Sequence, residues 1–395
     1  MPAASFVTGT FAYEDAYMDR PSIKPNQMQL DNLRPEIVSS YNLGVEGAFL
    51  KNLIRFSFDY YNKETTDLIM ENMAIQSTTG YSSVRRYNGG DVRNRGWEFS
   101  LSLNNIVKAG KFSLSLSNIN LSRNVNEITS LPESMVAEKY TIGNGNYARK
   151  IMEGNPIGSI YGYIFEGVYQ NYDETLARDA SGELIRDVNG NTVPIRVGGT
   201  TRMHPGDAKY KDINHDGVID ERDIVYLGSS FPTITGGGSL VLKYKGWQLR
   251  TSLHFRLGHS IVNKVRHDLE NMNTGNNQSK NVLRRWRYEG DDTDVPRALW
   301  GVNYNSMGSS KFVEDGSFLK IKDITLSYRI PQSFCSKLGI TNAMLSLTTY
   351  NLFTFTNYSG QDPEVGVGAG AYGLAIDSSR TPPSRRVAFN ISFSF

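Results

Sequence analysis

The amino-acid sequence is short of cysteine, of paired histidines and of long apolar runs, and each shortage removes a class of protein. Cys335 is the one thiol among 395 residues, so an internal disulfide and a multi-cysteine metal cluster are excluded. The five histidines show no HExxH or comparable pairing, which argues against a zinc site. Neither sign of charge is in excess, because the formal net charge is +2, and nothing suggests a nucleic-acid partner.

Targeting and catalytic signals are also missing. No apolar run is long enough for a membrane-spanning helix, and residues 1–20 lack the basic and apolar regions of a secretory signal. There is no Ser–His–Asp order, phosphate-binding glycine loop or nucleotide fingerprint, and the acid pair Asp291–Asp292 lies in a polar loop that does not fix its geometry. The sequence therefore predicts a protein that is not an enzyme.

Aromatic residues and glycine are plentiful, and they lie in alternating strands. The 22 Tyr, 18 Phe and 37 Gly are typical of β-rich proteins. In residues 246–257 one face carries Trp247, Leu249, Thr251, Leu253, Phe255 and Leu257, and the other is polar. This period of two predicts a half-buried strand, and it recurs in residues 53–61, 96–104 and 387–395.

Nine strands of this kind are predicted along the chain. We expect them at about 41–50, 52–66, 92–104, 110–122, 232–244, 246–257, 316–329, 342–357 and 386–395. The alternation changes parity at Lys322–Asp323 and again after Leu116, and each change predicts a β-bulge.

Two all-β architectures produce such alternation: a soluble sandwich buries the apolar face, whereas a membrane barrel turns it toward lipid. Strands of about ten residues or more favour the barrel, because that length crosses a bilayer. Short turns near 49–52, 105–111, 244–247 and 330–341 alternate with long polar connections near 67–91, 123–231, 258–315 and 358–384, which is also the barrel plan. The chain ends on an alternating strand whose last residue is Phe395.

Residues 212–223, DINHDGVIDERD, have the spacing of a calcium-binding loop with a turn at Gly217. The oxygen ligands of a structural Ca²⁺ would come from Asp212, Asn214, Asp216, the Val218 carbonyl, Asp220 and Asp223. The flanks carry Pro, Gly and β-branched residues, so no helix–loop–helix sensor is expected. The alternative is a surface turn whose Asp and Asn side chains cap their own backbone. Residues 187–191, DVNGN, predict an Asn-Gly hairpin turn instead.

Several sequence blocks occur in a recognisable order over nearly the whole chain. They are NLRPEIVSSYNLGVEGAFLKNLIRFSFDYYNKETTDLI (32–69), NGGDVRNRGWEFSLS (88–102), GNPIGSIYGYIFEGVYQ (154–170), PGDAKYKDINHDGVIDERDIVYLGSSFPTITGGGSLVLKYKGWQL (205–249), SFLKIKDITLSYRIP (317–331), YNLFTFTNYSGQDPEV (350–365) and the terminal aromatic strand. In order and content they resemble the C-terminal barrel half of the SusC/RagA-like TonB-dependent outer-membrane transporters of the Bacteroidetes.

The resemblance implies a partial transmembrane β-barrel in the outer membrane of a Bacteroidetes-like Gram-negative cell. It would import oligosaccharides or peptides with a SusD-like surface lipoprotein and draw energy from TonB through an N-terminal part. We expect residues 1–40 to be an extracellular loop remnant, 41–122 barrel strands, 123–231 a long extracellular loop with the calcium-type loop, and 232–395 the C-terminal barrel strands. Because nine strands are not an even, closed barrel and no plug domain is visible, the chain is expected to be a piece of a longer protein.

Candidate site residues carry two interpretations each. Tyr161, Tyr163, Phe165, Tyr169 and Tyr172 are candidates for stacking against sugar rings, or they pack an extracellular hairpin. Lumen-facing Arg250, His254 and Arg256 are candidates for lining the transport path or contacting a plug domain, or they form an ordinary solvated interior. Trp97, Trp247 and Tyr244 suit an aromatic girdle at the membrane interface. Ile391, Phe393 and Phe395 are the expected C-terminal signal for the barrel-assembly machinery.

Two other functions stay open at this stage. One is a soluble, calcium-stabilised β-protein that binds glycans, and such a protein would be monodisperse in solution without detergent. The other is a passive porin or surface adhesin, which would require a signal peptide of its own and an even number of strands.

Overall fold

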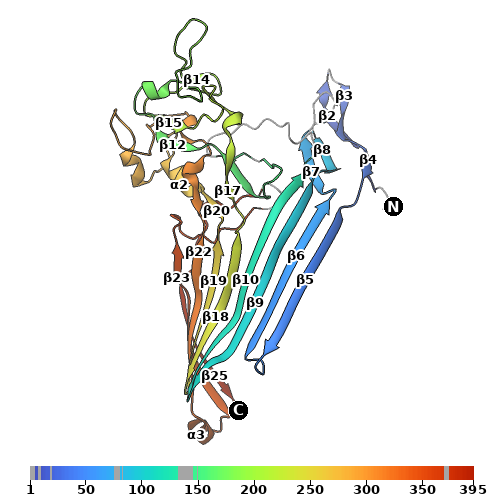
Figure 1. Ribbon diagram of the computed structural model, residues 1–395, viewed down its shortest axis with the longest axis vertical. Coiled ribbons are helices and arrows are strands. Elements are labelled where there is room, and N and C mark those ends of the chain that lie inside the picture. Colours follow the sequence, from blue (N-terminus) through green and yellow to red (C-terminus); the bar gives the residue numbers. More distant parts are fainter. Residues whose placement is uncertain are drawn as a thin grey trace.

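The computed structural model describes residues 5–7, 10–17, 20–74, 81, 83–131, 146–148, 150–368 and 373–395. Its main feature is a nine-stranded antiparallel sheet in which every strand pairs with the next large strand along the chain (Figure 1). The strands are β5 (Ile37–Phe49), β6 (Ile54–Thr66), β9 (Asp91–Ala109), β10 (Phe112–Ser130), β18 (Ile234–Tyr244), β19 (Trp247–Leu257), β22 (Phe318–Arg329), β23 (Asn342–Thr356) and β25 (Arg386–Ser394).

This sheet confirms the predicted all-β architecture of a partial barrel. Each of the nine predicted strands is present, in the predicted order. Within the described ranges the sheet stays open, since β5 and β25 each pair with one neighbouring strand. The two β-bulges are confirmed as well: the register skips Lys322 between Ile321 and Asp323, and it shifts between Ser117 and Asn120.

Two strands are longer than predicted. Both β9 and β10 have 19 residues, and they continue through most of the expected turn at 105–111. The register slips between Leu114 and Leu116, and the two strands then pair again as far as Ala109 and Phe112. The chain therefore reverses only at Gly110 and Lys111. At the other end both strands run beyond the predicted limits, to Asp91 and Ser130.

The long connections fold into small elements that gather at one end of the sheet, and the short turns and the C-terminus lie at the other end (Figure 1). Before β5 lie β1 (Ser5–Val7), β2 (Thr10–Tyr17), β3 (Arg20–Gln27) and β4 (Leu30–Leu33). Between β6 and β9 lie β7 (Ile69–Ala74) and β8 (Ser83–Asn88). Between β10 and β18 lie β11 (Ser159–Gly162), β12 (Phe165–Val168), η2 (Asp173–Thr175), β13 (Arg196–Val197), β14 (Thr201–Arg202), β15 (Ala208–Tyr210), β16 (Val218–Ile219), η3 (Glu221–Asp223) and β17 (Val225–Ser229).

The later connections contain the remaining elements. Between β19 and β22 are β20 (Ser260–Asn263), α2 (Lys264–Glu270), η4 (Lys280–Arg284), η5 (Tyr304–Ser306), η6 (Ser310–Phe312) and β21 (Val313–Asp315), and β24 (Ile376–Asp377) precedes β25. The turn between β22 and β23 holds α3 (Gln332–Cys335) and η7 (Ser336–Leu338). Among the described residues no helix is both long and apolar enough to cross a bilayer.

Most of the buried core lies in the described parts of these folded connections (residues 67–90, 146–233, 258–317 and 357–385). Its largest cluster is Ala148, Tyr161, Tyr163, Ala208, Tyr210, Ile219, Ile224 and Met307. Two smaller clusters form around Ile128 at the end of β10 and around Ile261 and Tyr358. The described parts of the expected loops at 67–91 and 123–231 are therefore structured, since each contains paired strands of its own.

Candidate functional site

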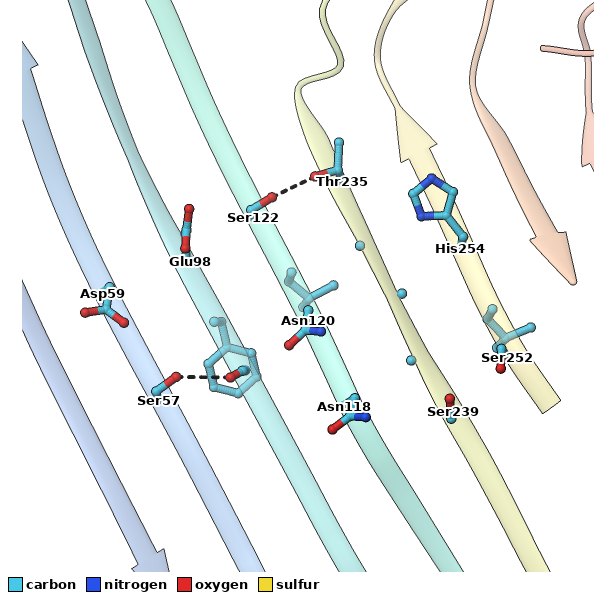
Figure 2. A pocket seen from close by; sticks show the side chains of 17 residues that line it. Ser57, Asp59, Glu98, Asn118, Asn120, Ser122, Thr235, Ser239, Ser252 and His254 are labelled. Carbon is cyan, nitrogen blue, oxygen red and sulfur yellow. Dashed lines mark hydrogen bonds between the residues drawn. The ribbon is translucent and has the colours of Figure 1, made fainter. Parts of the chain in front are cut away.

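The inner face of the sheet carries a polar groove. Its volume is about 560 Å³ and it crosses β6, β9, β10, β18 and β19 (Figure 2). Hydroxyl and amide side chains dominate the lining, in the set Ser57, Ser100, Asn118, Asn120, Ser122, Thr235, Ser239 and Ser252. They reach the same face because residues paired in an antiparallel sheet point to the same side, and the alternation of each strand keeps that side polar.

Hydrogen bonds between neighbouring strands fix part of this lining. Ser57 Oγ and Ser100 Oγ lie 3.0 Å apart, joining β6 to β9. Ser122 Oγ and Thr235 Oγ1 lie 2.7 Å apart, joining β10 to β18 (Figure 2). Small polar side chains that bond across strands leave the centre of the groove open.

Three consecutive glycines, Gly236 to Gly238, form the floor where the groove crosses β18. Gly237 pairs with Asn120 on one side and with His254 on the other. A Cβ at Gly237 would lie 2.6 Å from the carbonyl oxygen of Leu253, which is closer than side chains are found to approach. The wall is one backbone thick at this point, and no side chain fills the groove between Asn120 and His254.

The two ends of the groove differ in charge. Asp59 and Glu98 are direct cross-strand partners at one end, and His254 lies at the other (Figure 2). Arg250 and Arg256 point to the same face as His254, since they stand two residues from it on either side along β19 and face Thr325 and Phe318 of β22. The three residues predicted to face the lumen are therefore on the polar face, and His254 lines the groove itself.

A segment of the last long connection folds back onto this face. Residues 362–364, which we call the strap, are tied to β22 through Lys320 and Lys322. Lys320 Nζ donates to Asp362 Oδ1 at 2.7 Å and to Glu364 Oε2 at 2.8 Å, and Lys322 Nζ donates to Glu364 Oε2 at 2.7 Å. Burial alone would raise the pKa of Glu364, but the hydrogen bonds from the two ammonium groups prevail and lower this pKa to about 2.

The outer face of the sheet is apolar, yet it is exposed. Phe355 is 57% exposed, Phe389 64% and Val387 70%. Aromatic residues mark both limits of this surface: Trp97 stacks on Phe58 near one end, and Trp247 packs on Tyr328 with 4.6 Å between ring centroids at the other. The eleven residues of β19, at a rise of about 3.3 Å and a tilt of about 40°, span roughly 25 Å, which is the apolar height of an outer-membrane barrel.

Comparison with known proteins decides the family. A family model described as TonB dependent receptor-like, beta-barrel, matches residues 4–203. The chain belongs to the TonB-dependent receptor family. The TonB-dependent receptor P3 of Formosa agariphila is 31% identical over 347 residues, which cover 85% of this chain and 31% of that protein. The TonB-dependent receptor SusC of Bacteroides thetaiotaomicron is 26% identical over 375 residues, which cover 92% of this chain and 32% of that protein.

Solved structures agree on the fold. The structure of the RagAB peptide transporter matches with a TM-score of 0.71 at 23% identity, over 98% of this chain and 38% of that chain. This TonB-dependent receptor chain spans about a third of the length of the curated relatives that it matches.

Several expectations from the sequence are thereby confirmed. The resemblance to SusC and RagA holds over most of the chain. The chain is part of a TonB-dependent receptor barrel of the outer membrane, and the family is not one of enzymes. The alternative of a soluble glycan-binding protein is wrong for this TonB-dependent receptor chain, and nothing supports the porin or adhesin alternative.

The calcium-type loop has its carboxylate oxygens engaged by groups of the chain itself. Asp212 accepts from Asp216 N and Gly217 N, and Asp216 accepts from Val218 N. Arg222 forms ion pairs of 2.6 Å with both Asp216 and Asp220. Within the described ranges, no three acidic, His or Cys side chains converge as a metal site. Because the guanidinium of Arg222 stands where a cation would be expected, Ca²⁺ would have to displace it, and calcium binding stays a prediction.

The remaining ligand candidates of this loop are held in the same way. Asp223 is fully buried, and its two carboxylate oxygens accept from Ile213 N at 2.7 Å and Asp220 N at 2.9 Å. Burial raises the pKa of Asp223, and the two backbone hydrogen bonds oppose that rise. Asn214 bonds to Asp216 through its amide nitrogen. Val218 belongs to β16, which pairs with β13. This arrangement matches the alternative of a self-capped turn.

The aromatic run is mostly interior. Tyr161, Tyr163 and Tyr169 are at most 4% exposed, and Phe165 packs against the cluster that contains Tyr161 and Tyr163. In this structure a sugar ring has no access to the three buried tyrosines, so the packing interpretation fits better than substrate contact. Tyr172 differs, since it is exposed and lies edge-on to His204.

The C-terminal residues follow the outer face. Ile391 and Phe393 pair with Leu345 and Ala343 of β23 and are exposed, as is Phe395 beyond the end of β25. Lys320 and the strap were missed from the sequence, because a lysine in an alternating strand gives no sign of a partner 42 residues away. A useful signal would have been the acid pair Asp362 and Glu364 beside two inward lysines.

Proposed function

We propose that this chain supplies part of the lumen wall of an importer that carries oligosaccharides or peptides across the outer membrane, energised by TonB. The observation that carries the proposal is the contrast between the two faces of one sheet. The outer face exposes aromatic and aliphatic side chains over a bilayer-sized height, and the inner face holds a groove of hydroxyl and amide groups. Such a groove suits a ligand rich in hydrogen-bonding groups, and both nutrient classes are of that kind.

Three partners are proposed with this function, and each is assigned to a different part of the protein. A SusD-like lipoprotein would cover the end of the sheet where the folded connections gather (Figure 1), which would be the mouth of the complete barrel. TonB would act through an N-terminal plug outside the residues of this chain. The barrel-assembly machinery would engage β25, whose outward residues end in Phe393, together with Phe395 just beyond it. The peptide transporter among the matched structures supports peptides as one of the two substrate classes.

The test is uptake through the complete transporter that contains this chain. Cells would receive labelled oligosaccharides or labelled oligopeptides, with and without an uncoupler that removes the energy for TonB. Asn120→Trp would place a large side chain in the groove, and we expect the initial uptake rate to fall to the level of uncoupled cells. Leu121→Trp is the matched control, because Leu121 pairs with Phe99 of the outer face.

The outcomes separate the parts of the proposal. Uptake that is blocked by both the uncoupler and Asn120→Trp supports an energised path along this wall. Uptake that is unchanged by the uncoupler would refute the role of TonB. Normal uptake by Asn120→Trp would show that the transport path does not run through the groove. Whichever labelled nutrient enters identifies the substrate class.

A further inference from the structure

The outer face changes character where β9 and β10 leave the apolar band. Moving along the strands from the centre, successive outward rows are Phe58 with Phe99, then Tyr60 with Trp97 and Arg123, then Asn62 with Arg95, then Glu64 with Arg93 and Glu127. Aromatic rings are therefore followed at once by guanidinium groups. In a membrane barrel this step lies at the level of the lipid headgroups, because aromatic girdles stand at the interface.

Arg95 and Arg123 are the exposed arginines of this surface, and Arg95 also interacts electrostatically with Glu127. Both are exposed, and within the described part of the chain neither has an ion pair or a hydrogen bond to its guanidinium group. Arg93 differs, since its Nη2 lies 2.8 Å from Glu127 Oε2. The two acids of the region, Glu64 and Glu127, lie in the row beyond Arg95, whereas Arg123 borders Trp97.

The register places Arg95 and Arg123 close enough to act together. Arg123 pairs with Trp97 and Arg95 pairs with Val125, so the two arginines are diagonal neighbours on one face. Diagonal neighbours in an antiparallel pair stand about 7–8 Å apart, which long side chains bridge. Arginine presents a planar fork that binds phosphate oxygens in pairs, and its long stem lies along apolar surface while the head reaches the polar layer.

The inner face at the same height has no such cations in pairs. Its side chains form a neutral network in which Asn126 Nδ2 and Asn124 Nδ2 donate to Asn94 Oδ1, and Tyr61 donates to Asn124. Lys63 is a cation at this level on the inner face, because it pairs with Asn94 of the neutral network. Its neighbour along the strand, Asn62, points to the outer face and pairs with Arg95. The two arginines are therefore a feature of the lipid-facing side.

We propose that Arg95 and Arg123 bind the phosphate group of an outer-leaflet membrane lipid. The lipid would lie along the apolar surface beside Trp97 with its phosphate between the two guanidinium groups. The site is distinct from the transport path, because the arginines and the groove residues are on opposite faces of the sheet.

The experiment uses the complete outer-membrane protein that contains this chain, purified in mild detergent and freed of lipid. Native mass spectrometry would follow binding of diphosphorylated lipid A and of the same lipid after enzymatic removal of its phosphates. We expect the phosphorylated form to bind more tightly. The double variant Arg95→Gln/Arg123→Gln should lose about 30-fold in affinity, since each interfacial cation contributes about 5-fold. Lys63→Gln, on the other face, is the matched control and should bind as the unaltered protein does.

Equal binding of the two lipids to the unaltered protein would overturn the proposal, and this comparison requires no variant to fold. Unchanged affinity in the double variant, or an equal loss in Lys63→Gln, would also overturn it. Inorganic phosphate that displaces the lipid at similar concentrations would show an anion site without lipid selectivity and refute the lipid assignment. Arg95→Lys/Arg123→Lys keeps the charge but loses the planar fork, and we expect an intermediate affinity.

Discussion

The sheet and the folded connections treat apolar side chains in opposite ways. On the sheet, Phe355, Val387 and Phe389 face outward and are more than half exposed. In the connections, Tyr161, Ile219 and Met203 have no more than 1% exposure. Apolar side chains of this chain are therefore removed from water in two ways. Those of the sheet face lipid, and those of the connections pack into a core of their own.

The two regions also differ in how their backbone N–H and C=O groups are hydrogen-bonded. The sheet uses long ladders, such as the eleven paired positions between β18 and β19. The connections use side chains. In the segment 178–193 the same turn occurs twice: Asp179 Oδ1 accepts from Ser181 N and Glu183 N, and Asp187 Oδ1 accepts from Asn189 N and Asn191 N. Short polar side chains thus replace the ladder where strands are too short.

The largest expected effect tests whether the connections depend on buried charge. Asp207 is fully buried, and its carboxylate is held by Arg297 Nε at 2.7 Å and by Asn305 Nδ2 at 3.1 Å. Asp207→Ala leaves Arg297 without its partner and should destabilise the connections by about 3–5 kcal/mol. Hydrogen exchange should speed up in residues 146–233 and not in β18 or β19.

Glu183→Ala is the control for this prediction, because Glu183 is exposed, and we expect a change within about 0.5 kcal/mol. If exchange in the strands rises as much as exchange in the connections, the two regions unfold together and the comparison between them fails.

The second effect tests the sheet. Leu253 lies near the middle of β19 on the outer face, and Leu253→Arg should lower the free energy of unfolding in a bilayer by about 2–4 kcal/mol, as a cation at the membrane midplane does. Ser252→Arg adds the same charge to the groove and should cost far less. Denaturant unfolding of both variants in lipid vesicles would measure this, and equal losses would mean that the outer face is not in lipid.

The third prediction concerns the strap that joins the two regions. The pKa of Glu364 is lowered to about 2 from a reference value of 4.5. The stabilisation is therefore fully present above pH 4.5 and is lost as the pH falls toward 2. Nitroxide labels at Gln361→Cys and Arg250→Cys should move apart over this range. In a Glu364→Gln background the distance should not depend on pH in this window, and a pH-dependent distance there would assign the change to another group.

The smallest effect concerns the calcium-type loop. Arg222 is 56% exposed at its side chain, so its ion pairs contribute no more than about 1 kcal/mol. Arg222→Ala should destabilise the chelated protein slightly and should increase the rise in melting temperature on adding Ca²⁺, because Asp216 and Asp220 are released. If the unaltered protein already responds to Ca²⁺ as strongly as the variant, the guanidinium does not compete, and the calcium prediction gains support.

The sequence predicted the sheet better than the connections for a physical reason. Alternation is a local signal, so β6, β19 and β25 could be recognised from their own residues, and the bulge at Lys322 appeared as a change of parity. The core of the connections depends on distant partners, such as Asp207 with Arg297, 90 residues apart.

The candidate sites divide in the same way. His254 lies on the polar face of β19 with Arg250 and Arg256, because strand parity fixes orientation. The tyrosines near residue 161 were open to either interpretation, because no local pattern separates a ring at an exposed mouth from a ring in a small core. In the loop at 212–223, Arg222 at the eleventh position looked like an ordinary surface residue, and its contact with two acids became visible only in three dimensions.

The glycines at the floor of the groove restrict how this wall can vary in evolution. A Cβ at Gly236 would lie 2.7 Å from the carbonyl oxygen of Asn120, and one at Gly237 would lie 2.6 Å from that of Leu253. Neighbouring backbone is an obstacle at both positions and cannot move aside as a side chain can, and at Gly236 the ring of Phe255 also lies 2.6 Å away. The serines and asparagines that surround Gly237 can vary, whereas the thinnest part of the wall has almost no acceptable replacements.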